Sequence, residues 1–251
     1  MNRIALASEA ILPFPAPAQK GHLHESAAPL RRRFSRDFEL PYSTFAPIHY
    51  EEGYAYPLVV WLHDSASSEQ ELRQVMPLVS MRNYVAIAPR GTCPDGKHRG
   101  RYDWKQTSDS IESAQSLIAD CISLAEQRFN IHEKRIFLVG RGAGGTMAVR
   151  TAWNDPNRFA GVVSINGPLP TQLSPLRRVN ELRRVPCLLT TSRDSESYPS
   201  DQVCQDLRLL HVAGCTVALR QYPGCDNLTS NMLSDLDRWL MELVCSGNPG
   251  C

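Results

Sequence analysis

Short, nearly uninterrupted apolar runs recur along most of the chain. They cover residues 58–62, 84–88, 135–139, 161–165, 186–190 and 216–220. A run that is apolar at every position, and not at every second one, is typical of a strand buried on both faces of a parallel sheet. Upstream of these runs, residues 34–40 and 45–50 predict an opening antiparallel pair of strands, separated by Pro41, Tyr42 and Ser43.

Helical periodicity fills several of the stretches between the runs. In residues 110–128, 202–213 and 233–244, apolar side chains fall mainly three and four positions apart, as one face of a helix requires. The alternation of strand and helix predicts an α/β fold with a doubly wound, mostly parallel sheet of about eight strands and helices on both faces. Ligand sites in such a sheet lie at the carboxyl ends of the strands.

The chain divides into a leader, one domain and a short tail. Residues 1–29 are rich in Pro and Ala without periodicity, which indicates a flexible leader. Glu9 and several prolines interrupt any signal-peptide core in this leader. Residues 30–247 form the expected domain, and residues 248–251 form the tail. No apolar run approaches the roughly 20 residues that a membrane span requires.

Charge and cysteine spacing exclude several classes of function. With 27 Lys and Arg against 26 Asp and Glu, the net charge of +1 gives no field for nucleic acid or an anionic membrane. The basic run 31–33 is interpreted as the solvated start of an edge strand. Eight cysteines occur without Cys-x-x-Cys or Cys/His metal spacing, so we interpret them as mainly buried, reduced thiols. These observations predict a cytoplasmic protein without metal or cofactor.

Residues 136–150, IFLVGRGAGGTMAVR, contain the most informative local pattern. A buried-strand run leads into the glycine-rich turn 140–144, and a helix starts directly after it. This strand, turn and helix context is the one in which G-x-S-x-G presents a nucleophilic serine. The central position of the turn is Gly142. Glycine adopts the positive φ of such a turn almost freely, so the replacement keeps the turn and removes the nucleophile.

From about residue 57 to residue 243 the chain resembles the phospholipase/carboxylesterase group of α/β-hydrolases, close also to dienelactone hydrolases and polyester depolymerases. The resemblance rests on landmarks in order along the chain: Tyr56–His63, Ala88–Gly91, Trp104, Phe129-Asn130 leading through Arg135, Thr191–Asp194 and Tyr222–Asp226. It implies an α/β-hydrolase fold and cleavage of carboxylic esters.

The resemblance also implies a Ser, Asp and His triad, which this sequence does not supply. The matching positions read Gly142, Asp194 and Asp226. Gly142 has no attacking atom, and a second carboxylate cannot be the neutral base that activates a serine. Cys225 is a weak stand-in nucleophile because it would lack both a base and the elbow. Asp194 and Asp226 either face each other, with a raised pKa or a bound cation, or Asp226 caps a turn and points to solvent.

The oxyanion hole is altered as well. The backbone N–H groups of Ser65 and Ala143 are the expected donors, and Asp64 stands where the family has glycine after His63. A carboxylate at this place works against an oxyanion. We interpret His63 as a strand-end residue that hydrogen-bonds to loop backbone, in preference to a catalytic residue.

Three functions remain open. The leading hypothesis is a non-catalytic esterase homologue that binds a small carboxyl- or ester-like ligand, or a protein partner or second copy of the chain. In this hypothesis, free N–H groups at the helix start near Ala143 receive the anion. The alternative is an active carboxylic-ester hydrolase with a rearranged site. A purely structural role is the third.

Overall fold

The computed structural model describes residues 41–171 and 179–246. Its main feature is a seven-stranded sheet in the order β1-β3-β2-β6-β7-β8-β9. The strands are β1 (Tyr42–Phe45), β2 (Tyr56–Leu62), β3 (Val85–Pro89), β6 (Ile131–Arg141), β7 (Gly161–Ile165), β8 (Cys187–Ser192) and β9 (Val217–Tyr222). Only β1 pairs antiparallel, with β3, and the other neighbours are parallel. This arrangement is the α/β-hydrolase fold that the sequence predicts, with seven strands among the described residues.

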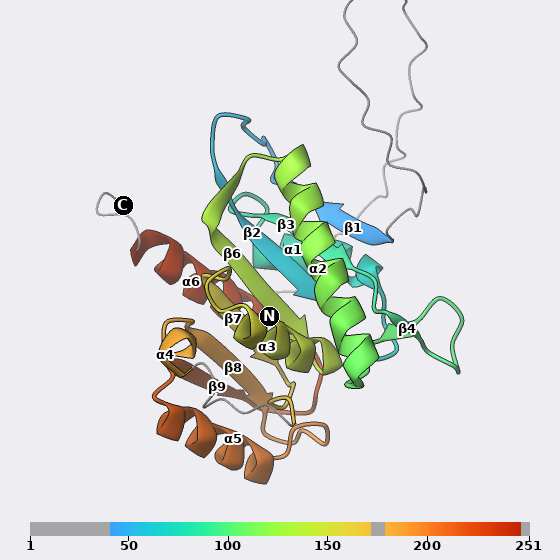
Figure 1. Ribbon diagram of the computed structural model, residues 1–251, viewed down its shortest axis with the longest axis vertical. Coiled ribbons are helices and arrows are strands. Elements are labelled where there is room, and N and C mark those ends of the chain that lie inside the picture. Colours follow the sequence, from blue (N-terminus) through green and yellow to red (C-terminus); the bar gives the residue numbers. More distant parts are fainter. Residues whose placement is uncertain (1–40, 172–178, 247–251) are drawn as a thin grey trace, which may run out of the picture. The chain divides into compact units, whose positions relative to one another are not determined.

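Helices cover both faces of the sheet (Figure 1). The helical segments are η1 (Glu69–Glu71), α1 (Leu72–Val79), α2 (Ser108–Arg128), α3 (Ala143–Asn154), α4 (Val179–Leu182), α5 (Ser200–Ala213) and α6 (Ser230–Ser246). Buried side chains of α2, α3 and α5 belong to one apolar cluster, and those of α1 and α6 belong to the other. A separate two-stranded ribbon, β4 (Cys93–Pro94) with β5 (Tyr102–Asp103), precedes α2.

The two clusters explain why the strand sequences are apolar at every position. In β2, Leu58, Val60 and Leu62 pack into the cluster beneath α2 and α3. Val59 and Trp61, between them, point to the opposite cluster beneath α1 and α6. Each face of the central strands is therefore a core, and successive side chains alternate between the two cores.

The opening of the domain differs from the prediction. The predicted strand 34–40 lies outside the described residues. The predicted strand 45–50 is wrong, because β1 spans Tyr42–Phe45 and pairs with residues 86–89 of β3. Beyond Phe45 the chain turns: Pro47 has no backbone N–H to donate, and His49 has a φ of 62°. The helix α1 and the ribbon β4-β5 were also not predicted.

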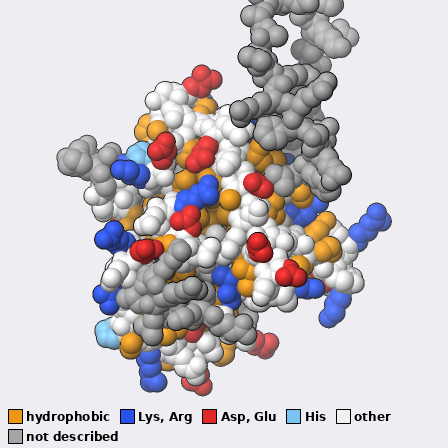
Figure 2. Space-filling model, in the orientation of Figure 1, with side chains coloured by type: hydrophobic (Ala, Val, Ile, Leu, Met, Phe, Trp, Pro, Cys, Tyr) orange, Lys and Arg blue, Asp and Glu red, His pale blue; other side chains and the backbone are white. Residues whose placement is uncertain are grey.

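Charged side chains of both signs are interspersed over the face shown in Figure 2. This distribution agrees with the near-zero net charge. Within residues 41–171 and 179–246, no helix is both long and apolar enough to cross a membrane.

The turn between β6 and α3 has the backbone geometry of a nucleophile elbow. Gly142 has φ 49° and ψ −121°, a backbone conformation that residues other than glycine adopt only under strain. Its N–H donates to the Ile165 carbonyl at 2.8 Å, and its carbonyl accepts from Thr146 N–H at 3.1 Å. A Cβ on Gly144 would collide with the Leu62 and His63 carbonyls, so β2 and α3 approach too closely for a side chain there.

We expect Gly142→Ala to lower the free energy of unfolding by at least about 1 to 3 kcal/mol, because alanine is strained at this φ. The added Cβ would also overlap the carboxylate of Asp64. Urea denaturation measures the change. Gly53→Ala is the matched control, since Gly53 has an ordinary φ and open space around the added atom. A Gly142→Ala protein as stable as the parent would contradict the strained-elbow assignment.

Candidate functional site

A cavity of about 500 Å³ lies over Gly142, at the carboxyl end of the strands. Its walls come from the loops after β2, β7, β8 and β9, from the segment before α2 and from the start of α3. The residues that line it are Asp64, Ser65, Trp104, Gln106, Gly142, Ala143, Thr146, Asn166, Pro168, Leu169, Thr171, Ser197 and Asp226. This is the place where open α/β sheets bind ligands.

The carboxylate of Asp64 occupies the centre of this site. Its Oδ1 accepts a 2.7 Å hydrogen bond from Ser65 N–H and a long, 3.4 Å one from Ala143 N–H. The same oxygen lies where a Cβ of residue 142 would be. The two backbone groups expected to stabilise an oxyanion therefore share one acceptor, which the protein itself supplies.

Arg141 balances the negative charge of Asp64, whose side chain is 29% exposed. Its Nε lies 3.6 Å from Asp64 Oδ2, and its Nη2 donates to the Asp226 carbonyl at 3.0 Å. Arg141 thereby connects the loop after β2 with the loop after β9. The expectation of free N–H groups for an external anion is wrong at Ser65 and Ala143, because Asp64 already uses both.

His63 holds the loop that carries Asp64. Gly91 N–H donates to His63 Nε2 at 2.9 Å, so that nitrogen must be unprotonated. Nδ1 therefore carries the proton and donates it to the Asp64 carbonyl at 2.7 Å. Trp104 Nε1 donates to the His63 carbonyl at 3.0 Å, and the centroids of the Trp104 and His63 rings lie 5.3 Å apart. His63 is fully buried, and the predicted hydrogen bonding of this strand-end residue to loop backbone is confirmed.

Burial also sets the charge state of His63. Desolvation lowers the pKa of its imidazole below the ordinary value, although the hydrogen bond to the Asp64 carbonyl and nearby carboxylates oppose the shift. Neutral imidazole is the form that both hydrogen bonds require. Protonation of Nε2 would place a donor against the Gly91 N–H.

Asp226 lines the opposite side of the cavity, in the loop after β9. Its Oδ2 accepts from Ser197 N–H at 3.3 Å, whereas its Oδ1 is buried without a hydrogen-bond partner among the described residues. Partial burial opposes ionisation, but the Ser195 hydroxyl and the Ser197 N–H outweigh it, so the pKa of Asp226 lies below its usual range. Asp226 is therefore ionised near neutral pH, and it is not the solvent-directed turn cap that was one of the two sequence interpretations.

The structure does not bring Asp194 to the cavity. Its side chain is 54% exposed and lies 3.4 Å from the Arg193 Nε. The next residue, Ser195, is buried, and its hydroxyl accepts from Tyr198 N–H at 2.9 Å and stabilises the Asp226 carboxylate. The residue that contacts Asp226 is thus Ser195. It lies one position after Asp194, which the sequence interpretation took as the acid of the triad. The burial of Ser195 could not be read from its polar neighbours.

Two buried charged residues support the cavity wall from behind. Arg150 of α3 donates from Nε to Gln106 Oε1 at 2.7 Å and from Nη2 to the Thr171 carbonyl at 2.8 Å. Asp206 of α5 accepts from Leu169 N–H at 2.9 Å and from the Tyr198 hydroxyl at 2.8 Å. These bonds fix the segment after β7 and the segment before α2. The sequence analysis did not single out either residue.

Other candidate chemistry lies away from the cavity or is not found. Cys225 is exposed and is not part of the lining. Cys204 is exposed as well, so the expectation of buried thiols is wrong for these two cysteines, whereas burial raises the pKa of the Cys121 and Cys187 thiols to about 12. In the part of the chain that the structure describes, no three His, Cys, Asp or Glu side chains are grouped to hold a metal ion.

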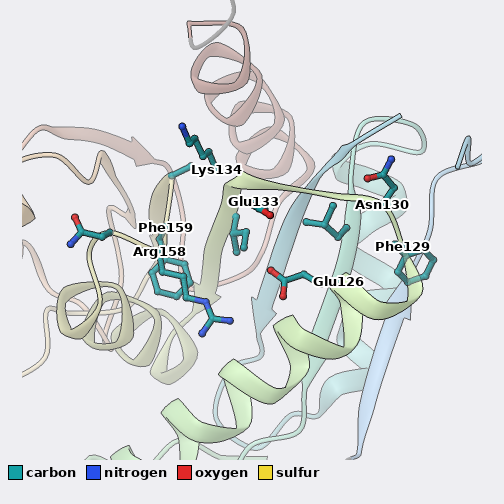
Figure 3. Close-up of a pocket in the computed structure, with 11 residues that line it drawn as sticks. Glu126, Phe129, Asn130, Glu133, Lys134, Arg158 and Phe159 are labelled. Atoms are coloured by element: carbon teal, nitrogen blue, oxygen red, sulfur yellow. The ribbon is translucent and has the colours of Figure 1, made fainter. Parts of the chain in front are cut away.

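A second cavity, of about 800 Å³, lies at the other end of β6 (Figure 3). It is lined by the end of α2, the first residues of β6 and the loop before β7, and its charged residues Glu126, Glu133, Lys134 and Arg158 are of both signs. It is larger than the cavity over Gly142. It lies at the amino end of the strands, however, where neither the elbow nor a helix N-terminus points, so we take the cavity over Gly142 as the site.

We expect stability to fall below about pH 6.5 because of His63. The unfolded chain binds this proton more readily than the folded protein, since the folded-state pKa lies below 6.5. The stabilisation is complete above pH 6.5 and is lost toward the lower folded-state pKa, with a slope approaching about 1.4 kcal/mol per pH unit. Urea denaturation from pH 7 to pH 5 measures this slope.

His63→Gln is the variant that isolates this effect, because glutamine does not titrate. The slope between pH 7 and pH 5 should be smaller in His63→Gln than in the natural protein. His211→Gln removes an exposed histidine from α5 and should leave the slope unchanged. Equal slopes in the natural protein and His63→Gln would contradict a buried, neutral His63.

Comparison with known proteins agrees with this architecture. A family model described as Phospholipase/Carboxylesterase matches residues 96–242, more than half of the chain. A comparison with curated protein sequences finds no significant match.

Solved structures show the same fold at low sequence identity. A Bacillus cereus carboxylesterase superposes with a TM-score of 0.63 at 14% identity, covering 82% of this chain and 96% of its own. A Mesorhizobium loti carboxylesterase gives 0.64 at 16%, covering 75% and 90%. Arabidopsis thaliana SOBER1 gives 0.62 at 17%, covering 76% and 100%. With its elbow turn, its α/β-hydrolase sheet and the family match over residues 96–242, the chain belongs to the phospholipase/carboxylesterase family.

Proposed function

We propose that this protein is a non-catalytic member of its family, a pseudoesterase that keeps the cavity and has lost the reaction. The observation that carries the proposal is the Asp64 carboxylate. It fills the space beside Gly142 and accepts both expected oxyanion donors, Ser65 N–H and Ala143 N–H. An ester carbonyl that entered the cavity would meet a negative charge where its own developing charge needs donors.

The other requirements of acyl transfer fail independently. Gly142 offers no nucleophile, and Asp226, with its lowered pKa, is a weak proton acceptor. Asp194, the proposed family acid, is exposed, and Ser195 takes the place beside Asp226. A triad that lacks its nucleophile, base and acid retains only what its oxyanion hole supplies. Here the hole is occupied.

A rearranged hydrolase is the alternative. Asp64 is the group nearest to the elbow, so it would have to be the nucleophile. Its Oδ1 is engaged by two N–H groups, and Oδ2 faces Arg141, so both oxygens are stabilised as the bound anion. Release of the resulting acyl-enzyme would still require a base. The geometry therefore favours the pseudoesterase.

The remaining parts of the proposal concern the cellular location, the ligand and the partners of the protein. A cytoplasmic location is supported by thiols such as Cys121 and Cys187, which are buried in the core. The retained cavity supports a small-molecule ligand, although an ionised carboxylate at the N–H groups would compete with Asp64. A protein partner or a second copy of the chain is compatible with the same site.

We expect the purified protein to hydrolyse p-nitrophenyl butyrate at the rate of buffer alone. The absorbance of the released p-nitrophenolate measures the rate. The comparison is the same assay on Gly142→Ser/Asp226→His, with and without Asp64→Gly and Ser195→Asp. The pseudoesterase proposal would be contradicted by saturable hydrolysis that copurifies with the natural protein and that the Asp64→Asn substitution abolishes.

We expect Asp64→Gly to bind butyrate at least about tenfold more tightly than the natural protein does. The substitution frees Ser65 N–H, Ala143 N–H and Arg141, and hydrogen bonds to a charged group contribute about 1.5 to 3 kcal/mol. Isothermal titration calorimetry measures the affinity. Asp64→Asn is the matched control, because it removes the charge but still fills the space. A gain of the same size in Asp64→Asn would show that charge, not occupancy, keeps carboxylates out.

A further inference from the structure

The larger cavity, at the amino end of β6, takes no part in the pseudoesterase proposal (Figure 3). Its volume is about 800 Å³, and its walls are the end of α2, the first residues of β6 and the loop before β7. Four charged side chains line it, namely Glu126, Glu133, Lys134 and Arg158. Two of them are negative and two are positive, so the charges of the lining sum to zero. A net charge on a ligand would therefore gain nothing from this lining.

The charged side chains of this cavity are not paired with one another. In Figure 3, Glu126 of α2 and Arg158 of the loop before β7 point toward each other across the cavity, whereas Lys134 extends away from it. Neither Glu126 nor Arg158 forms an ion pair or a side-chain hydrogen bond with another residue of the described ranges. Arg158 is nevertheless half-buried. A guanidinium that loses part of its water without an acceptor is stabilised by a carboxylate that enters the space beside it.

An irregularity in β6 forms one wall of the cavity. A single residue of β2, Pro57, stands opposite four residues of β6, 132–135. Pro57 has no N–H to donate to this ladder, and the pairing of β6 with β7 begins only at Phe137. The segment 132–135 is therefore a bulge, and it brings the exposed Glu133 to the cavity wall. Bulges of this kind commonly aim side chains at binding sites.

The buried part of the lining is apolar. Ile136 and Phe159 are buried, and Phe129 and Ile131 are partly buried against the same core. An apolar group that covers these side chains removes their remaining surface from water. The cavity thus combines unpaired charges of both signs with an apolar surface between them.

We propose that this cavity binds a small zwitterion, an α-amino acid with an apolar side chain, whose carboxylate lies on Arg158 and whose ammonium group lies on Glu126. The planar guanidinium of Arg158 offers parallel N–H donors that fit a carboxylate. The Glu126 carboxylate accepts from the three donors of an ammonium group. A ligand with only one of these charges would pair with one wall and leave the other unpaired. The apolar side chain of the ligand lies against Phe159 and Ile136.

Three probes with the same phenylethyl skeleton test the proposal on the natural protein. At pH 7 free phenylalanine is a zwitterion, phenethylamine carries only the ammonium group and 3-phenylpropionate carries only the carboxylate. We expect calorimetric titration to give a dissociation constant for phenylalanine at least about tenfold lower than that for either single-charge probe. Binding of phenylalanine that is no tighter than that of one of these probes overturns the proposal, as does an absence of saturable binding at millimolar concentration.

Two charge-removing variants locate the ligand. Arg158→Gln should weaken the binding of phenylalanine to the level of phenethylamine, because the carboxylate loses its partner. Glu126→Gln should weaken it to the level of 3-phenylpropionate, because the ammonium group loses its partner. An affinity for phenylalanine that either variant leaves unchanged overturns the assignment to this cavity.

Matched controls carry the same substitutions outside the cavity. Glu112→Gln changes an exposed glutamate of the same helix, α2, and Arg184→Gln changes an exposed arginine before β8. Both variants should bind phenylalanine as the natural protein does, and a loss in either one overturns the proposal, because overall charge would then decide the binding. The probe series on the natural protein decides the matter if a variant does not fold. These titrations do not involve ester hydrolysis, so their outcome is independent of the pseudoesterase proposal.

Discussion

The positive φ at Gly142 is the constraint on which the site depends. This turn reverses the chain between β6 and α3 and brings the helix start against the loop after β2. The contact is so close that Gly144 admits no side chain beside the Leu62 and His63 carbonyls. Whatever residue follows His63 must therefore lie beside the elbow. In this chain that residue is Asp64, and its carboxylate takes the space that a side chain at residue 142 would need.

Gly142 and Asp64 are consequently a coupled pair. Glycine at the elbow leaves a hollow, and a carboxylate from the neighbouring loop fills it. Any side chain at position 142 would overlap the Asp64 carboxylate unless that carboxylate rotated away and gave up its bonds to Ser65 N–H and Ala143 N–H. The backbone that carries Asp64 is held in place, because both ring nitrogens and the carbonyl of His63 are hydrogen-bonded. The two departures from the family pattern, which look separate in the sequence, are one packing arrangement in the structure.

Much of the fold could be predicted because both sheet faces are cores. The run 161–165 coincides with β7, and the other buried runs match their strands to within a few residues. The opening strand was misplaced because an edge strand with one partner has no such pattern, and its pairing with β3 is a long-range contact. The elbow was predictable from its glycines. The exposure of Asp194 was not predictable. In this loop the side chains of neighbouring residues point in different directions, so Asp194 is exposed while Ser195, the next residue, is buried.

The proposed loss of reactivity would also stabilise the fold. An empty oxyanion hole leaves backbone donors to water or substrate, and it holds a strained residue at the elbow, a cost that catalysis requires. In this chain glycine removes the strain, and Asp64 supplies an acceptor for Ser65 N–H and Ala143 N–H. Arg141 then neutralises the added charge. In the proposed pseudoesterase, the backbone groups of the oxyanion hole stabilise the resting fold and not a transition state. Two buried polar atoms of the site, Arg141 Nε and Asp226 Oδ1, have no hydrogen-bond partner among the described residues.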